Sequence, residues 1–484
     1  MVNVKTVFVS GNFNILHPGH LRLLRFSREL GDKLIVGVNS DRIGGETVHV
    51  TEKLRLEGIL SNNWVNEAFL VDEPITQVLE RLKPDVVVKG KEFENYLNVE
   101  RDVLKKYGGK LVFSSGEAAF SSLDLIRKNL PNTDSLDIHS LQAFAHRHDF
   151  DIESLGYLID QLSNLRVCVI GDLIVDEYIT CDPLGMSQED PTIVVTPVDT
   201  QRFVGGAGIV AAHAAGLGAK AHFISIAGKD ETREYASDAL TKQNVYVHLS
   251  VDESRPTTLK QRFRAHNKTL LRVSHLHQGS IGKKLQSEIE NKLLSLIDDL
   301  DLLVLSDFNY GCLPQILVDK IIEHCRKRDI TIVGDSQCSS QVGDISRFKG
   351  MHLLTPTERE VRVSLRNQED GLVVVAERLK QLANARNIIM TLGSEGVLLH
   401  MEDQKHQSLT DRIPALNPMP MDVAGAGDSM LITTGLALAC GANPWQAAGL
   451  GSVASAIQVS RLGNQPLDKE EFLRVLREHK KNTY

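Results

Sequence analysis

Two glycine-containing turns near opposite ends of the 484-residue chain each come directly before a stretch with the apolar spacing of a helix. The first turn, Gly11–His20, follows the apolar, β-branched run Lys5–Ser10, and the second, Asp422–Ser429, leads into Met430–Ala439. A helix N-terminus offers unpaired N–H groups and the positive end of the helix dipole, so both turns are candidate anion sites. A chain of this length is expected to form two or three domains, and we expect the turns to lie in different ones.

The composition excludes several classes of partner. The chain has 54 basic and 62 acidic side chains and a formal net charge of −8, which argues against a general nucleic-acid or anionic-membrane binder. Its 6 cysteines form no CxxC pair, so neither a disulfide framework nor a zinc site is expected. We also expect no signal peptide and no membrane span, since no apolar stretch approaches ~20 residues. These features predict a cytoplasmic protein with no nucleic acid and no membrane as partner.

Residues 1–130 alternate between short apolar runs and helical patterns. Leu21–Leu30 has apolar residues at helical spacing, and Leu34–Asn39 has the pattern of a buried strand. Further strand patterns lie at Phe69–Val71, Val86–Val88 and Lys110–Phe113. This alternation predicts an α/β domain over residues 1–130, with a Rossmann-like parallel sheet and helices on both of its faces.

The first turn carries two histidines, His17 and His20, around Gly19. Two imidazoles at a helix N-terminus can stabilise charge on a phosphate, whereas two surface histidines beside a turn are the simpler alternative. The string resembles the HxGH motif of nucleotidylyltransferases. Residues 7–42 resemble the opening of the cytidylyltransferase-like family, especially the adenylyltransferase half of bacterial ADP-heptose synthases.

This resemblance implies a catalytic pair, His17 and His20, and a set of nucleotide ligands. The implied nucleotide-binding residues are Gly11, Phe13, Asn14, Arg55, Lys89, Ser121 and Ser122. The sequence departs from the family at Asn14, where aspartate is common, and in the loop Arg42–Thr47, which lacks the usual lysines. A first domain without catalytic activity is therefore an alternative.

Residues 131–150 are predicted to link two domains. Pro131–Ser135 interrupts the periodic pattern, and Leu136–His148 is mildly helical and rich in histidine. We interpret this segment as a solvated connector, and a metal site is the weaker alternative because nothing fixes the geometry of the histidines. Ile152–Leu165 is predicted to be an amphipathic helix.

Residues 151–484 contain an ordered series of motifs. The first is a buried-strand pattern, Arg166–Asp172, followed by Asp176 and Tyr178. The later motifs are Gly205–Gly218, Thr257–Arg264, Leu305–Gly311, Leu354–Glu360, Asp422–Asp428 and Val459–Gly463. The series resembles the ribokinase (PfkB) family of sugar kinases, particularly its heptose-phosphate kinases. The resemblance implies a ribokinase-like α/β fold with a small β lid.

The second turn also has a chemical interpretation of its own. The backbone N–H groups of Gly425, Ala426 and Gly427 can form an anion hole for a transferred phosphoryl group. Asp428 at the helix start can take the proton of an acceptor hydroxyl. An ordinary helix cap is the alternative, because aspartate often caps helices.

The kinase resemblance implies ligands for both substrates. The implied sugar-binding residues are Asp172, Asp176, Gly205, Gly206, Lys260 and Arg262. Those for ATP and Mg²⁺ are Asp307, Glu360, Gly393 and Gly396, with Glu360 acting on Mg²⁺ through water. Lys260, Arg262 and Arg264 alternate along a strand and should share one face, although a solvated basic face is equally consistent. The chain departs from the family at Ile209, Tyr310, Thr357 and Ala424.

As a whole the chain resembles bifunctional heptose-phosphate kinase/nucleotidylyltransferases with the domain order reversed. The implied reactions are phosphorylation of the anomeric hydroxyl of a sugar or sugar phosphate by Mg-ATP, then transfer of a nucleotidyl group from ATP or CTP to the sugar 1-phosphate. The alternatives are a sugar kinase with a degenerate N-terminal domain and a nucleotide-sensing scaffold. Two short lid strands, Thr192–Thr196 and Thr200–Val204, are predicted, and pairing of two lids predicts a homodimer.

Overall fold

The computed structural model describes residues 5–14, 16, 18–45, 48, 50–90, 98–114, 136–190, 192–265, 268–337, 343–402 and 408–477. The chain divides into two compact units. One spans Met1–Asp134 and Leu365–Ala376, and the other spans Ser135–Ser364 and Glu377–Tyr484. Each contains its own sheet and its own apolar core, so the two are described separately.

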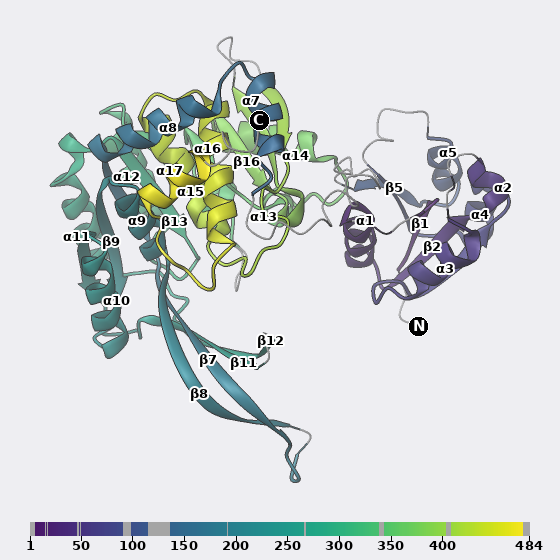
Figure 1. The fold of residues 1–484 in the computed structure, drawn as a ribbon, viewed down its shortest axis with the longest axis horizontal. Helices are drawn as coiled ribbons and strands as arrows, with labels where there is room; N and C mark the ends of the chain where they lie inside the picture. Colours follow the sequence, from purple (N-terminus) through teal and green to yellow (C-terminus); the bar gives the residue numbers. More distant parts are fainter. Residues whose placement is uncertain are drawn as a thin grey trace. The chain divides into compact units, whose positions relative to one another are not determined.

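The first unit is built on a five-stranded sheet in the order β3-β2-β1-β4-β5, and every neighbouring pair is parallel (Figure 1). Its strands are β1 (Thr6–Gly11), β2 (Lys33–Asn39), β3 (Glu67–Val71), β4 (Val86–Gly90) and β5 (Lys110–Ser114). The helices of residues 5–114 are α1 (Pro18–Glu29), α2 (Asp41–Gly44), α3 (Glu52–Leu60), α4 (Ile75–Leu82) and α5 (Glu100–Lys105). In such a doubly wound sheet, ligands bind at the carboxyl ends of the strands that flank the reversal of order, here β1 and β4.

Apolar side chains of this sheet alternate between its two faces. Val7 contributes to a core that includes Leu24 of α1, whereas the adjacent Phe8 contributes to a separate core with Leu79 of α4. Successive side chains of a strand point in opposite directions, so the two cores lie on opposite faces. The predicted parallel sheet with helices on both faces is therefore confirmed.

The second unit has a nine-stranded sheet in the order β10-β9-β6-β13-β14-β15-β16-β17-β18. Its first seven strands are parallel, and β17 and β18 are added antiparallel. The strands are β6 (Arg166–Gly171), β9 (Lys220–Ala227), β10 (Tyr246–Val251), β13 (Leu302–Asp307), β14 (Thr331–Ser336), β15 (Leu353–Leu354), β16 (Asn387–Thr391), β17 (Val397–Glu402) and β18 (Ser408–Ile413).

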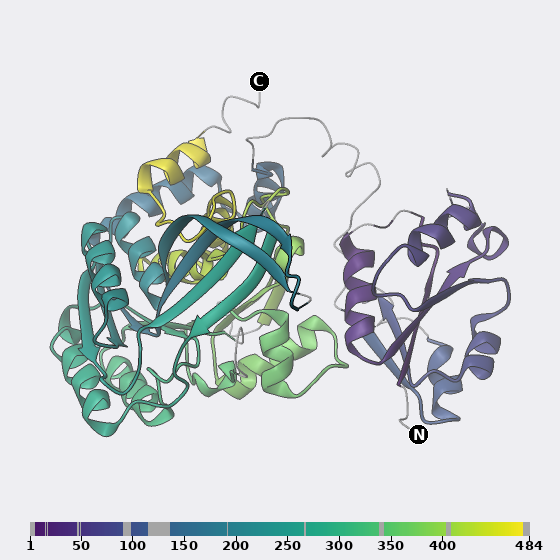
Figure 2. The same ribbon diagram turned by 90° about the horizontal axis from the view of Figure 1, so that it is seen from below.

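Helices cover both faces of this sheet (Figure 2). The helices of residues 136–477 are α7 (Ile138–Arg147), α8 (Ile152–Gln161), α9 (Ala207–Gly216), α10 (Glu231–Lys242), α11 (Lys283–Leu294), α12 (Gln315–Arg326), α13 (Glu358–Leu365), α14 (Leu372–Ala383), α15 (Ala426–Ala439), α16 (Pro444–Gln458) and α17 (Lys469–Arg477). Short 3₁₀ helices are η3 (Leu162–Asn164), η4 (Ile297–Asp299), η5 (Ile345–Arg347) and η6 (Gly393–Glu395). No helix among the described residues is long and apolar enough to cross a membrane.

A four-stranded lid sheet in the order β12-β11-β7-β8 projects from the second unit (Figure 1). Its strands are β7 (Leu173–Met186), β8 (Ile193–Gly206), β11 (Thr258–Ala265) and β12 (Lys268–His275). The prediction of two short strands at 192–196 and 200–204 is wrong, because β8 is one continuous strand paired along its length with β7. It continues through Pro197 because β8 is an edge strand, where proline is tolerated.

The segment interpreted as a solvated connector is also different from its prediction. Its residues 138–147 form α7, and the side chains of Leu141 and Phe144 are completely buried in the core of the second unit. His148 stacks on Trp445 of α16 with ring centroids 3.9 Å apart, and its Nε2 lies 2.8 Å from Oδ2 of Asp411. The interpretation was wrong because the apolar residues between the histidines, among them Leu141 and Phe144, recur at helical spacing and form one buried face of a helix.

Candidate active sites

The turn at 425–428 forms the start of α15, a helix that packs against β13 and β14. Gly425 has a φ of 77°, a left-handed conformation that favours glycine, and an added Cβ there would lie 2.6 Å from Oδ1 of Asn464. Asp428 is in the first turn of α15 and is 6 % exposed. The N–H of Ala426 donates a long, 3.5 Å bond to the carbonyl of Val423. Asp428 lies in the same first turn, so the predicted base and the predicted anion hole are adjacent.

The charge state of Asp428 is tuned by its surroundings. Burial raises the pKa of Asp428 to about 7, the charges of Asp176 and Glu360 also raise it, and that of Lys260 lowers it. Asp176 belongs to β7 and Lys260 to β11, so both come from the lid, whereas Glu360 belongs to α13. A carboxylate that titrates near neutral pH is well suited to accept a proton from a hydroxyl.

Two further residues, Gln337 and Asp335, lie beside Asp428, and no motif in the sequence had pointed to them. Nε2 of Gln337 donates a hydrogen bond of 3.2 Å to Oδ1 of Asp428. Burial raises the pKa of Asp335 well above its ordinary value, and the charges of Glu360 and Asp428 raise it further. Both residues lie at the carboxyl end of β14, and that position at the end of a buried parallel strand is the signal that could have identified them.

Asp335, Glu360 and Asp428 supply carboxylate oxygens, the ligand type that Mg²⁺ prefers. Oδ1 of Asp335 is buried with no hydrogen-bond partner among the described residues. Oε2 of Glu360 accepts a 2.8 Å bond from the N–H of Thr357. Among those residues, no group of three His, Cys, Asp or Glu side chains could hold a metal ion by itself. The donor set therefore fits a Mg²⁺ ion that keeps several waters and nucleotide phosphates as ligands.

The predicted sugar-binding residues meet at the base of the lid. Oδ1 of Asp176 accepts a 3.1 Å bond from Nη2 of Arg262, and its Oδ2 accepts a 3.4 Å bond from Nδ2 of Asn464. An added Cβ at Gly205 would lie 2.6 Å from Oδ2 of Asp176, and one at Gly206 would lie 2.4 Å from the carbonyl oxygen of residue 172. The two glycines therefore make room for this carboxylate and for the strand that carries it.

The basic residues of β11 share one face, as predicted. Arg262 and Arg264 place their guanidinium carbons 5.1 and 5.2 Å from the ring centroid of Tyr178. Nζ of Lys260 lies 5.2 Å from the ring centroid of Tyr310. Each cation thus faces an aromatic ring, and this attraction holds its side chain in place. The arrangement favours a binding face over a solvated basic face.

Asp172 and Asp307 are bonded within the protein. The carboxylate of Asp172 accepts three backbone N–H bonds of 2.8 to 3.2 Å from the 308–312 loop. Burial, followed by the charge of Asp307, raises the pKa of Asp172 to about 6. Oδ2 of Asp307 accepts a 2.7 Å bond from Nη2 of Arg347. Asp172 therefore orders a loop beside the lid, Asp307 pairs with an arginine, and ligand contacts of either remain predictions.

Gly393 and Gly396 lie in the turn between β16 and β17, with φ values of 63° and 91°. An added Cβ at Gly396 would lie 2.1 Å from a carbonyl oxygen of β18, whereas one at Gly393 would meet open space. Thr391 of β16 pairs with Thr357, so this turn lies beside the start of α13, the helix of Glu360.

In the first unit, the predicted nucleotide-binding turn follows β1. Phe13, with a φ of 48°, is buried and packs edge-on against His20 in the first turn of α1, with ring centroids 5.1 Å apart. An added Cβ at Gly11 would lie 3.3 Å from the ring of Phe13, and Asn14 is half-buried in the same turn. Three predicted residues, His17, Ser121 and Ser122, lie outside the described residues.

Two of the implied nucleotide-binding residues, Arg55 and Lys89, are paired with carboxylates. The side chain of Arg55 is fully buried, and its Nη2 lies 2.7 Å from Oδ1 of Asp41. Nζ of Lys89, at the end of β4, lies 2.8 Å from Oε1 of Glu100. Both charges are therefore balanced within the protein, and nucleotide contacts of either residue remain predictions.

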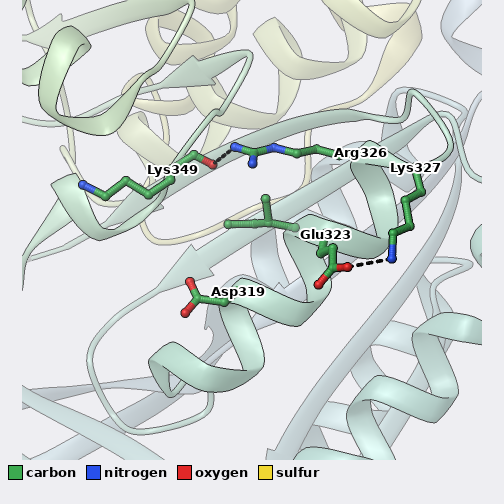
Figure 3. A pocket seen from close by; sticks show the side chains of 6 residues that line it. Asp319, Glu323, Arg326, Lys327 and Lys349 are labelled. Carbon is green, nitrogen blue, oxygen red and sulfur yellow. Dashed lines mark hydrogen bonds and ion pairs between the residues drawn. The ribbon is translucent and has the colours of Figure 1, made fainter.

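A surface pocket of about 370 Å³ lies elsewhere, on α12 (Figure 3). It is lined by Asp319, Ile322, Glu323, Arg326, Lys327 and Lys349. Within it, Nζ of Lys327 pairs with Glu323 at 2.6 Å, and Nη2 of Arg326 donates to the backbone carbonyl of Lys349 at 2.9 Å (Figure 3). None of the predicted site residues lines it.

Two family models match the chain. Residues 164–470 match the pfkB family carbohydrate kinase model, and residues 8–115 match the cytidylyltransferase-like model. A bifunctional protein HldE from Desulfatibacillum aliphaticivorans is 29% identical over 67% of this chain and 64% of its own length. One from Geobacter metallireducens is 30% identical over 64% of this chain and 62% of its own length. The chain thus spans a little less than two thirds of these relatives.

Solved structures resemble the second unit in fold. A ribokinase from Thermotoga maritima aligns with 65% of this chain and 99% of its own, at 21% identity and a TM-score of 0.51. Phosphofructokinase-2 from Escherichia coli aligns over the same fractions at 17% identity and a TM-score of 0.54. At such identities the likeness shows the fold alone, and it confirms the predicted ribokinase-like architecture.

Proposed function

Because the chain belongs to the pfkB family of carbohydrate kinases, we propose that its second unit transfers the γ-phosphoryl group of ATP to a hydroxyl of a sugar or sugar phosphate. The observation that carries this proposal is the position of Asp428. Its carboxylate is buried at the N-terminus of α15, and burial raises its pKa to about 7. A proton acceptor is thereby held next to N–H groups that can bind the phosphoryl group.

In the proposed reaction, the acceptor oxygen forms a bond to the γ-phosphorus while the bond to the bridging oxygen of ATP breaks, and ADP leaves. Asp428 takes the proton of the hydroxyl. The N–H groups of residues 425–427 stabilise the negative charge on the phosphoryl oxygens. Mg²⁺ bound with ATP would neutralise phosphate charge, with Glu360 and Asp335 holding it through water.

We further propose that the acceptor is a sugar phosphate similar to a heptose 7-phosphate, phosphorylated at its anomeric hydroxyl. Asp176 can accept hydrogen bonds from sugar hydroxyls, and Lys260, Arg262 and Arg264 give the lid the positive charge that a phosphate requires. Ile209, which stands where the family has an asparagine, is buried in the core and offers no polar group. The hydroxyl contacts should therefore differ from those of the family.

For the first unit we propose nucleotidyl transfer, in which the sugar 1-phosphate attacks the α-phosphate of ATP or CTP and pyrophosphate leaves. The support is the position of Gly11, Phe13 and His20 beside the reversal of strand order. One observation favours the alternative of a degenerate domain: Arg55 and Lys89 are both engaged with carboxylates. Nucleotide binding would then require these ion pairs to open.

We also propose a homodimer formed by the lids. The outer halves of β7 and β8 expose a series of apolar side chains: Leu184, Met186, Ile193, Val194 and Val198. β8 is an edge strand whose outer side is unpaired within the described chain. Pairing with a second copy would bury these side chains and remove the free edge.

The direct test is incubation of the protein with ATP, CTP and a panel of sugars, sugar phosphates and sugar 1-phosphates, with release of ADP and of pyrophosphate measured separately. Release of both products supports the two-step proposal. ADP release alone, with nucleotide binding to the first unit, supports the degenerate alternative. Tight nucleotide binding with neither product across the panel would support the scaffold alternative.

A further inference from the structure

One hydrogen bond connects the lid directly to the segment that precedes the anion hole. The hydroxyl of Tyr178, on β7, donates a 3.0 Å bond to Oδ2 of Asp422, 244 positions away. Tyr178 is 5 % exposed, and burial raises the pKa of its hydroxyl, so the group remains protonated and can only serve here as the donor.

At the other end of this bond, the carboxylate of Asp422 accepts hydrogen bonds from the backbone next to the turn at 425–428. Its Oδ1 accepts a 3.1 Å bond from the N–H of Ala424, and its Oδ2 accepts a 3.0 Å bond from the N–H of Gly463. Nε2 of Gln458 holds the carbonyl of Ala424 at 3.2 Å. Both the N–H and the C=O of residue 424 are therefore fixed directly before Gly425, where the backbone turns into α15.

On the lid side, Tyr178 contacts the residues expected to hold the sugar. The guanidinium groups of Arg262 and Arg264 lie over its ring, and Arg262 also bonds Asp176. Phe203 of β8 packs edge-on against the same ring, with centroids 5.2 Å apart. An acceptor that binds Arg262 and Arg264 therefore binds groups that lie directly over the ring of Tyr178, whose hydroxyl donates to Asp422.

We propose that Tyr178 is a positioning residue that couples the occupied lid to the order of the anion hole through Asp422. This inference rests on the proposed kinase function and adds a specific link to it. With the link intact, engagement of the acceptor by the lid favours the arrangement in which the N–H groups of residues 425–427 point at the transferred phosphoryl group. Loss of the link should impair the transfer step more than binding of the acceptor.

The test compares Tyr178→Phe with the wild-type protein. The substitution keeps the ring beside Arg262 and Phe203 and removes only the hydroxyl. We expect kcat of the kinase reaction to fall by about 10- to 100-fold, the factor expected for losing a hydrogen bond to a charged acceptor, with KM for the sugar changed less than about threefold. Tyr235→Phe is the matched control, because its hydroxyl donates at 2.6 Å to the carbonyl of Arg202, also in the lid, but reaches no part of the turn.

A second measurement does not depend on turnover. Amide hydrogen exchange of residues 424–428 in the substrate-free protein should be faster in Tyr178→Phe, and also in Asp422→Asn, which weakens the link from its other end. Exchange should be unchanged in Tyr235→Phe. Unchanged exchange in both link variants, or a rise in KM with an unchanged kcat in Tyr178→Phe, would overturn the inference. If wild-type protein phosphorylates no acceptor, the kinase proposal fails, while the exchange result still decides whether the link exists.

Discussion

The side chains of Gln337 and Asp428, 91 positions apart in the chain, are joined by a 3.2 Å hydrogen bond in which Nε2 donates to Oδ1. Gln337 immediately follows β14, while Asp428 lies in the first turn of α15. The bond fixes the orientation of one oxygen of the proposed base and leaves the other oxygen for the acceptor hydroxyl.

Gln337→Leu should therefore impair catalysis without unfolding the protein. We expect kcat to fall by about tenfold, the effect of removing a donor to a charged acceptor. Steady-state kinetics with separate determination of KM would measure it. Gln381→Leu is the control, since its Nε2 bonds Glu377 at 2.6 Å on the exposed surface of α14. Equal kcat values for the two variants would contradict a role for Gln337.

The buried carboxyl of Asp428 should make stability depend on pH. Because its folded-state pKa, about 7, lies above the ordinary 3.8, the folded protein binds this proton more tightly than the unfolded chain. The associated stability is fully present below pH 3.8 and is lost as the pH rises through about 7. Asp428→Asn should thus raise the melting temperature at about pH 8 and have a smaller effect at about pH 5, in protein free of nucleotide and divalent cations. A pH-independent difference would show that Asp428 does not titrate in this range.

Helix α7 should contribute strongly to the stability of the second unit. Phe144 is completely buried, so Phe144→Ala should lower the free energy of unfolding by about 3–5 kcal/mol, as for other buried aromatic truncations. Urea denaturation would measure this loss. Tyr157→Ala on α8, where the side chain is 70% exposed, should have little effect. A fragment that begins at residue 136 should also melt at a higher temperature than one that begins at residue 150, and the reverse order would mean that α7 does not stabilise the unit.

The proposed lid dimer makes a prediction about assembly. Ile193→Asp together with Val198→Asp places charges among the exposed apolar side chains of β8 and should convert a dimer into a monomer. Light scattering at micromolar concentration would report the mass. Leu409→Asp changes a similarly exposed residue on β18 and should leave the dimer intact. A monomeric wild-type protein with full kinase activity would contradict the lid dimer.

The sequence predicts the two α/β architectures because their signals are local. A β-branched run, a glycine turn and a helical period define each βαβ unit, and the alternation of strands and helices then requires parallel sheets. The turn before α15 is predictable for the same reason, since Gly425 and Asp428 lie within four residues of the helix start.

The roles that the sequence did not reveal depend on contacts between distant segments. Asp172 is bonded by a loop 136 to 140 positions later, and Arg55 is buried against Asp41 and the backbone of residue 12. Gln337 becomes relevant only when β14 and α15 are brought together. Motif matching assigns a residue type to a role, but the partner that occupies the side chain is decided by tertiary packing.

The central claim is that two reactions take place in separate units, and paired substitutions test it most directly. Asp428→Asn should lower the kcat of ADP release by ~10²–10⁴, the usual contribution of a positioned base, and leave pyrophosphate release from sugar 1-phosphate and nucleotide unchanged. His20→Ala should abolish pyrophosphate release and leave ADP release unchanged. Both assays would be run on the same preparations of each variant, with cooperative thermal unfolding of each preparation as evidence that it is folded. Loss of both activities in either variant, or near-wild-type ADP release in Asp428→Asn, would contradict the account.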